Sequence, residues 1–221
     1  RPIRIFNYNL HNGFDPDGRL TIEEMAQAIE AENPDVVLLQ EVARGWLIYG
    51  SLDMLEWLSQ RLGMAYVYAP TTGPLWGNAI LSRLPIENVE QHTLPPRDLL
   101  LRRGFVTAQV DTGGDRPLNV IDTHLHNPDD GSDVRVHQVE TLLDYVQDLS
   151  GVVLAGDLNA EPDSPEMKML EAAGLRDAVA EAGVLPDFTF PSRGASKRID
   201  YIWLSPDLTP SEVAIPTVRC V

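Results

Sequence analysis

Residues 151–162 read Gly-Val-Val-Leu-Ala-Gly-Asp-Leu-Asn-Ala-Glu-Pro. The apolar run at 151–155 predicts a short buried strand that leads directly into Asp157 and Asn159. These two residues are two positions apart, so in extended chain their side chains leave on one face while Leu158 turns into the core. A carboxylate and an amide at a strand end could together orient a water and a charged oxygen. The alternative is that both are ordinary turn residues.

Other predicted strands also end in polar residues. A carboxylate such as Glu41 at the end of an apolar strand is costly to bury alone. A divalent cation would be a suitable partner, and the alternative is that Glu41 simply leaves the core for solvent. His124 and His126 share a face in extended chain, where either could donate a proton to an oxyanion near neutral pH. The polar residues at strand ends are Asn9, Glu41, Asn78, His124, Asp157, Asn159 and Asp200.

Strands and helices alternate loosely along the chain, with a hairpin predicted at 104–110 and 117–123. This pattern predicts two mixed sheets packed face to face with helices outside, a four-layer α/β sandwich whose site lies where strand ends meet. Amphipathic helices are expected at 51–62 and 133–149. No internal repeat or linker divides the chain, so residues 1–221 are predicted to form a single domain.

Composition limits the class of partner. Seventeen basic and thirty-three acidic residues give a net charge of −16 and a pI near 4.5, which disfavours a protein that lies along duplex nucleic acid. No apolar run approaches the roughly 18 residues of a membrane span. The single cysteine, Cys220, excludes an internal disulfide and a multi-cysteine zinc site.

The oxygen-rich set of strand-end residues suits Mg²⁺ or Mn²⁺, and such a cation beside acid-base groups suits hydrolysis of a phosphate ester.

Six short motifs resemble the endonuclease/exonuclease/phosphatase superfamily, whose members share the DNase I-like fold. They occur in the family's order and extend over nearly the whole chain. The motifs are Tyr-Asn-Leu at 8–10, Leu-Gln-Glu-Val at 39–42, Gly-Asn-Ala-Ile-Leu-Ser-Arg at 77–83, Thr-His-Leu at 123–125, Gly-Asp-Leu-Asn at 156–159 and Arg-Ile-Asp-Tyr-Ile at 198–202.

The resemblance implies a divalent-metal-dependent phosphodiesterase that uses a metal-bound water. Glu41 is then the expected principal ligand of Mg²⁺ or Mn²⁺, with Asn9 beside it. His124 would stabilise the phosphate oxygens or assist the leaving group, and Asp157 would activate the water. Asn159 would hold the phosphate or the water. Asp200 usually orients a histidine of a terminal Ser-Asp-His motif, and the residues expected to bind substrate are Asn78, Asn127 and Arg135.

That terminal motif is absent from the sequence. The chain ends at residues 218–221, where a short further strand would be expected, so the domain is predicted to lack its last strand and a catalytic histidine. Losing one acid-base group typically costs about 10²- to 10⁴-fold in rate. A looser resemblance, through residues 11–15, 57–58, 62–64 and 76–77, is to domains attached to multi-pass membrane proteins of GPI-anchor lipid remodelling and their bacterial relatives. A chain that begins without methionine fits such an attachment.

Two kinds of phosphodiesterase and one non-catalytic function remain open. A nuclease should gather Arg97, Arg102, Arg103, Lys197 and Arg198 into a basic groove, although a solvated loop is an alternative for the first three. A lipid or small-molecule enzyme should instead show apolar loops, with Trp46, Leu47 and Trp76 as candidates. The third possibility is a binding or accessory domain that keeps the fold. In each case we expect a monomer.

Overall fold

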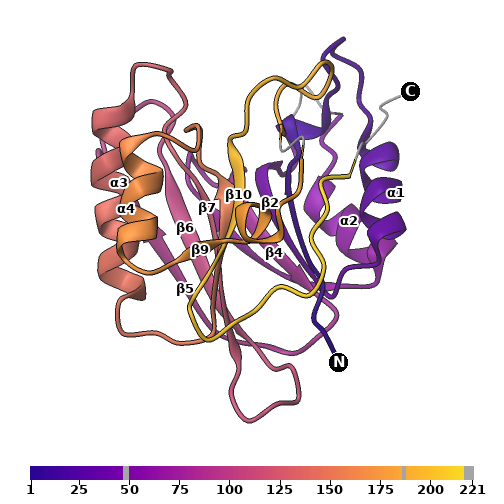
Figure 1. Ribbon diagram of the computed structural model, residues 1–221. Coiled ribbons are helices and arrows are strands. Elements are labelled where there is room, and N and C mark those ends of the chain that lie inside the picture. The colour runs from indigo at the N-terminus through magenta and orange to yellow at the C-terminus, as the bar shows by residue number, and fades with distance from the viewer. Residues whose placement is uncertain (47–49, 186–187, 217–221) are drawn as a thin grey trace.

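Two β-sheets pack face to face, and helices cover the outer face of each sheet (Figure 1). The computed structural model describes residues 1–46, 50–185 and 188–216. This arrangement is the predicted four-layer α/β sandwich. The elements in chain order are β1 Ile5–Asn9, η1 His11–Gly13, α1 Ile22–Glu32, β2 Val36–Ala43, α2 Met54–Leu62, β3 Ala65–Pro70, β4 Trp76–Ser82, β5 Ile86–Thr93, β6 Gly104–Val110, β7 Leu118–His124, α3 Ser132–Val146, β8 Val152–Asp157, α4 Pro165–Ala172, β9 Arg176–Asp177, α5 Ala178–Ala182 and β10 Asp200–Leu204.

The first sheet has the strand order β1-β2-β4-β3, and only β1 and β2 run parallel to each other. The buried residues of α1 and α2, on the right of Figure 1, pack against its outer face. The second sheet has the order β5-β6-β7-β8-β10-β9, in which β7 and β8 are parallel. Helices α3 and α4 cover this sheet on the left.

Apolar side chains point alternately to opposite faces of the strands and so fill three separate core layers. In β2, Val37 and Leu39 belong to the core under α1 and α2, whereas Val36 and Leu38 belong to the core between the sheets. Successive side chains of a strand leave on opposite faces, so a strand covered on both sides reads as a continuous apolar run. The buried run of β2, which predicted a strand, is therefore explained by its position between two layers.

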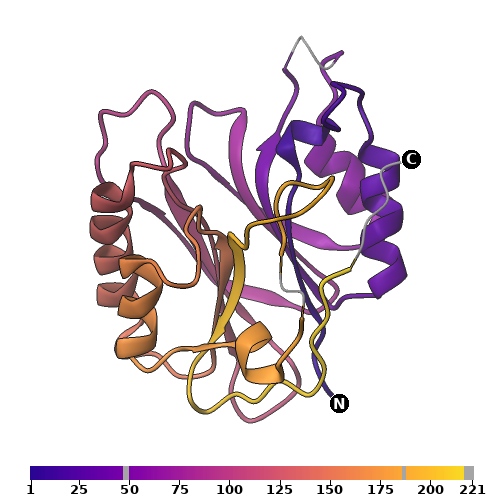
Figure 2. The ribbon, with the colours of Figure 1, turned by 45° about the horizontal axis from the view of Figure 1, so that its top comes forward.

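Strand direction brings the polar strand ends to one edge of the sandwich, which Figure 2 turns toward the viewer. Asn9 and Glu41 lie at the same end because β1 and β2 are parallel. His124 and Asp157 lie together because β7 and β8 are parallel. Strand β10 runs antiparallel to β8, so its first residue, Asp200, is the register partner of Asp157. We call this edge the site edge.

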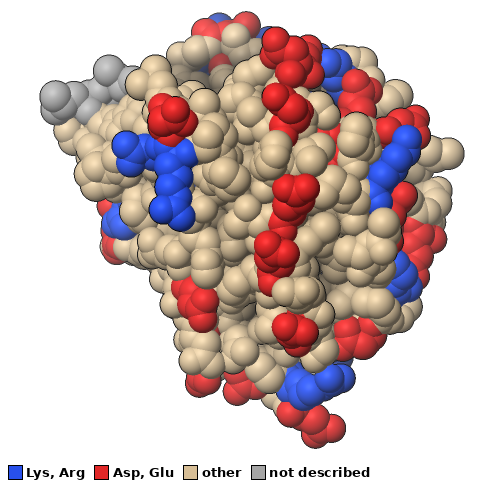
Figure 3. Space-filling view, turned by 90° about the vertical axis from the view of Figure 1, so that its left-hand side faces the viewer, with Lys and Arg blue, Asp and Glu red and all other residues tan. Residues whose placement is uncertain are grey.

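The face that carries α3 and α4 is acidic. Figure 3 shows a column of Asp and Glu side chains down this face, and α3 exposes Asp133, Glu140 and Asp144. Such a surface repels phosphate backbones. Among the described residues, no helix is both long and apolar enough to cross a membrane.

Candidate active site

Asp157 lies at the centre of a polar cluster on the site edge. Its Oδ2 accepts a hydrogen bond from Asn9 Nδ2 at 2.9 Å, and its Oδ1 accepts one from the backbone N–H of Asn159 at 3.0 Å. The residue is 5% exposed. Burial raises the pKa of Asp157 to about 6; the charge of Glu41 adds to this rise, and the two hydrogen bonds oppose it. Asp157 is thus a carboxylate with increased basicity in a fixed orientation.

A glycine allows Asp157 to lie beside His124. A Cβ on Gly156 would stand 1.8 Å from the carbonyl oxygen of Thr123, so no other residue fits where β8 meets β7. The parallel register then pairs His124 with Asp157, and His124 Nε2 lies 3.8 Å from Asp157 Oδ2. The Gly-Asp pair of the sequence therefore determines this approach of the two strands.

Glu41 is displaced from the regular strand by a bulge. The pairing of β2 with β4 shifts register between Leu39 and Val42, and Glu41 has φ 54°, in the left-handed region. Its Oε1 accepts a hydrogen bond from Asn9 at 3.4 Å, and its Oε2 accepts one from Asn12 at 3.2 Å. A non-glycine residue in this conformation is uncommon, and bulges often re-aim a side chain near active sites.

Two residues hold this carboxylate in roles that the sequence did not indicate. Trp76 Nε1 donates to Asn12 Oδ1 at 2.7 Å, and Asn12 in turn donates to Glu41. Trp76 is 5% exposed, so it is a support of the site and does not form the apolar substrate loop expected for a lipid enzyme. Trp46 is half-buried, and Leu47 lies outside the described residues.

Arg103 determines which nitrogen of His124 carries the proton. The guanidinium Nη1 lies 3.0 Å from His124 Nδ1, and both side chains are buried. Because arginine is a donor only, Nδ1 must accept and Nε2 carries the hydrogen. Burial, with a smaller contribution from Arg103, lowers the pKa of His124 well below its ordinary value. His124 is therefore a neutral hydrogen-bond donor here, a form that suits stabilising phosphate oxygens.

Asp200 faces Asp157 across the pairing of β10 with β8. Its backbone N–H donates to Thr189 Oγ1 at 3.2 Å. Burial, and then the charge of Asp157, raise the pKa of Asp200 well above its ordinary value. Neighbouring carboxyl groups each oppose ionisation of the other, so Asp200 holds its proton to a higher pH than an exposed carboxyl does. The histidine expected to partner Asp200 would follow residues 217–221, which lie outside the described residues.

Asn78 and Asn159 have contacts within the protein. Asn78 is buried, and its Nδ2 donates to the Gly104 carbonyl at 3.3 Å, which joins β4 of one sheet to β6 of the other. Asn159, with φ 49°, donates from Nδ2 to the Leu125 carbonyl at 3.1 Å. This bond uses one of the two amide hydrogens of Asn159 and leaves the other for a phosphate or water.

Of the other two residues expected to bind substrate, one is exposed and one is buried. Asn127 is exposed just beyond β7, and contact with substrate stays a prediction. Arg135 is 4% exposed and donates to Glu166 at 2.8 Å and to the carbonyls of His126 and Pro128. The structure thus directs its guanidinium into the protein. This arrangement favours Arg135 holding the segment that carries Asn127, and it disfavours direct contact between Arg135 and substrate.

The basic groove expected of a nuclease does not form. Arg103 is buried against His124, and Arg198 is buried and pairs with Asp177. Lys197 lies 3.5 Å from Asp129. Of these five residues, Arg97 and Arg102 are exposed, and they line a separate pocket.

The sequence comparison agrees with this geometry. The pattern of the Endonuclease/Exonuclease/phosphatase family matches residues 6–219. The chain belongs to this family. A curated relative is the uncharacterized Escherichia coli K12 protein YbhP, which is 24% identical over 228 residues, covering 97% of this chain and 89% of YbhP.

Solved structures of this family share the fold. The endonuclease/exonuclease/phosphatase from Beutenbergia cavernae has a TM-score of 0.74 at 26% identity over 92% of this chain, which spans 64% of that protein. The human Nocturnin catalytic domain, solved with a bound sulfate anion, has a TM-score of 0.70 at 22% identity, over 93% of this chain and 83% of that domain. A humanized zebrafish (D. rerio) TDP2 has a TM-score of 0.71 at 19% identity, over 94% and 86%.

Members of this family typically use divalent metals, and the oxygen donors around Glu41 fit such an ion. Glu41 is partly exposed and forms no salt bridge to a described lysine or arginine. Its contacts are neutral amides, so its charge is not neutralised by direct pairing. Within the described residues, no three His, Cys, Asp or Glu side chains form a metal cluster. Mg²⁺ is commonly held by one or two carboxylates, with water and substrate oxygens completing the shell.

Proposed function

We propose that this family member is a Mg²⁺- or Mn²⁺-dependent phosphodiesterase. The observation that supports this most is the convergence of one polar cluster from both sheets at the site edge. Asn9 bridges Glu41 and Asp157, and Asp157 lies between His124 and Asp200. A candidate metal ligand, a base and a hydrogen-bond donor therefore lie around one reacting centre.

Each side chain of this cluster has a chemical role in the proposal. Glu41 and Asn9 would hold the cation, which when bound neutralises phosphate oxygens. Asp157 takes a proton from the attacking water, since its pKa of about 6 leaves it ionised near neutral pH. His124 donates from Nε2–H to a phosphate oxygen.

The protonated carboxyl of the facing pair completes the proton balance. The water oxygen forms the new bond to phosphorus, and the bond to the leaving oxygen breaks. Asp200, opposite Asp157, supplies a proton to that leaving oxygen. Two carboxyl groups whose environments separate their pKa values commonly act one as the base and the other as the acid.

The charges of the chain bear on the class of substrate. The net charge of −16 and the pairing of Lys197 and Arg198 with carboxylates oppose binding along a nucleic acid. They favour a small-molecule or lipid diester. Attachment of the chain to a multi-pass membrane protein, and its monomeric state, stay predictions.

The test is hydrolysis of bis(p-nitrophenyl) phosphate beside the p-nitrophenyl monoester, in Mg²⁺ or Mn²⁺ and then in chelator. We expect metal-dependent cleavage that is faster for the diester. Glu41→Gln should lose both turnover and metal affinity, whereas Glu87→Gln, exposed on β5, should change neither. Asp157→Asn should keep metal affinity and lose about 10²- to 10⁴-fold in turnover. Absence of turnover with both metals would favour the alternative of a non-catalytic binding domain.

A further inference from the structure

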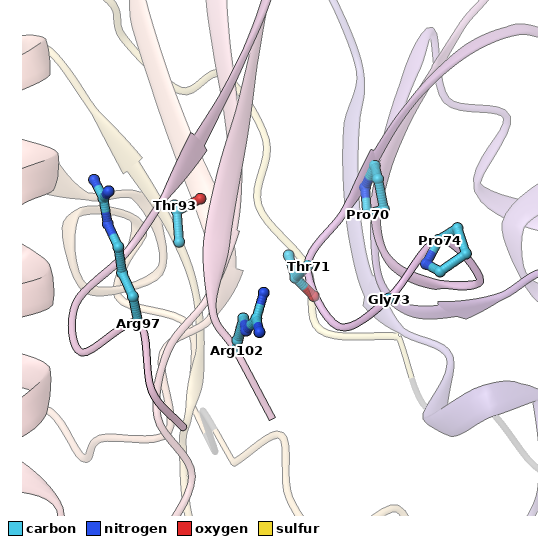
Figure 4. Close-up of a pocket in the computed structure, with 7 residues that line it drawn as sticks. All are labelled: Pro70, Thr71, Gly73, Pro74, Thr93, Arg97 and Arg102. Atoms are coloured by element: carbon cyan, nitrogen blue, oxygen red, sulfur yellow. The ribbon is translucent and has the colours of Figure 1, made fainter. Parts of the chain in front are cut away.

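Two loops of the site edge border an open pocket of about 420 Å³. One loop joins β3 to β4 and contributes Thr71 and Pro74, and the other joins β5 to β6 and contributes Arg97 and Arg102. Figure 4 shows Arg102 between Arg97 on the left and Thr71 on the right. The volume falls in the usual range for a small-molecule site.

The guanidinium groups of Arg97 and Arg102 have no partner among the described residues. Among the described residues, neither guanidinium makes a hydrogen bond or an ion pair, although both side chains are exposed. Asp98 lies in the same loop but pairs with neither of them. In a chain with thirty-three acidic and seventeen basic residues, two unpaired arginines in one pocket are available for an anion.

The pocket is held in shape by one bond between its two loops and by one bond within the β3–β4 loop. Thr72 Oγ1 accepts a hydrogen bond from the backbone N–H of Arg102 at 2.9 Å. The N–H of Thr71 donates to the Trp76 carbonyl at 2.9 Å. Because these backbone groups are fixed before any ligand arrives, less ordering is needed on binding.

The pocket adjoins the candidate active site through the same strands. Thr93 is the register partner of Gly104, whose carbonyl accepts from Asn78. Arg102, which lines the pocket, is followed by Arg103, which contacts His124. One molecule could therefore extend from the Asp157 cluster into the pocket.

We propose that this pocket binds a second anionic group of the substrate, so that the substrate is a phosphodiester carrying a further phosphate or comparable anion. The arginines supply charge-assisted hydrogen bonds to that group, and the hydroxyls of Thr71 and Thr93 supply neutral ones. The link to hydrolysis rests on the proposed function, whereas anion binding in the pocket does not.

The first experiment measures anion binding without catalysis. Inorganic phosphate is titrated into the isotope-labelled protein in chelator, and NMR follows the Nε–H signals of Arg97 and Arg102 and the amides of Thr71 and Thr93. We expect saturable shifts there, lost in the double variant Arg97→Ala/Arg102→Ala and kept in Arg116→Ala. Arg116 is an exposed arginine between β6 and β7, at the opposite edge. Absence of saturable shifts at the pocket, or equal shifts in the double variant, would overturn the proposal.

The second experiment tests the substrate class. Thymidine 5′-(p-nitrophenyl phosphate) is compared with the same compound carrying a 3′-phosphate. The added phosphate should lower KM about tenfold in the parent protein and leave KM unchanged in the double variant. Equal KM values in the parent protein would overturn the substrate assignment. If neither compound is cleaved while phosphate still binds in the pocket, the proposed function fails and the anion site stands.

Discussion

Arg103 and Arg135 are almost equally buried, at 3% and 4% exposure, but their surroundings differ. Arg135 forms a salt bridge with Glu166 at 2.8 Å and also donates to two backbone carbonyls. Arg103 contacts the neutral ring of His124, lies over the ring of Trp76 at 5.5 Å, and leaves its buried Nε without a partner. Burial lowers the pKa of Arg103, whereas the more distant charges of Glu41 and Asp157 raise it.

The difference indicates what each arginine contributes. A buried charge that is matched by one carboxylate is part of the packing between α3 and α4. A buried charge without such a partner reduces stability, and Arg103 lies where positive charge can act on a bound phosphate. We infer that Arg135 stabilises the fold and that Arg103 positions His124.

The largest expected effect is on stability, and it comes from removing the carboxylate that pairs with Arg135. Glu166→Ala should lower the free energy of unfolding by about 3–5 kcal/mol, because Arg135 is then buried without a counter-charge. Urea unfolding measures this change. Glu171→Ala, at an exposed position of the same helix, is the control and should change little. Restored stability in the double variant Arg135→Met/Glu166→Leu would support the explanation, and a stable Glu166→Ala would contradict it.

The next largest effect is on turnover, and it comes from replacing Arg103. Arg103→Met should reduce kcat about 10²-fold, while the urea midpoint stays equal or rises because a buried charge is removed. Ring ¹⁵N shifts of His124 should show hydrogen on Nε2 in the parent protein and a mixture of tautomers in the variant. Arg103→Lys, which keeps a donor, should retain the parent tautomer. An unchanged tautomer in Arg103→Met would show that Arg103 does not position the ring.

The smallest effect tests a third buried ionisable group, Asp122, in the core between the sheets. Asp122 Oδ1 accepts from Gln40 Nε2 at 2.6 Å, and burial raises the pKa of Asp122 well above its ordinary value. Keeping the carboxyl protonated in the folded state lowers stability increasingly as pH rises above the unfolded pKa, until the folded pKa is reached. Asp122→Asn should therefore match the parent Tm near the unfolded pKa and exceed it at neutral pH. A parallel pH dependence in both proteins would contradict this assignment.

Much of the fold could be predicted because its strands carry local signals. Buried strands such as β2 and β8 are apolar runs ending in polar residues, and β8 continues through Gly156 to Asp157. Strand β5 was not predicted, since six of its residues are exposed and its sequence Ile-Glu-Asn-Val-Glu-Gln-His-Thr has no apolar run. Its pairing with β6 defines it, and pairing is not a local property.

The candidate site was predicted less completely than the fold. Sequence motifs indicated Asn9, Glu41, His124 and Asp157, and the structure brings these together. The sequence did not indicate the roles of Asn12 and Trp76, because their bond joins positions 64 residues apart. Arg135 was expected to bind substrate, but its guanidinium pairs with Glu166, which comes from another helix.

The sequence by itself determined where strands lie and which of them end in polar residues, because side-chain alternation and polarity act between neighbours in the chain. Tertiary structure decided which strand ends meet, through parallel and antiparallel pairing. It also decided which buried arginine has a carboxylate partner, because the energy of a buried charge depends on groups brought near it by folding.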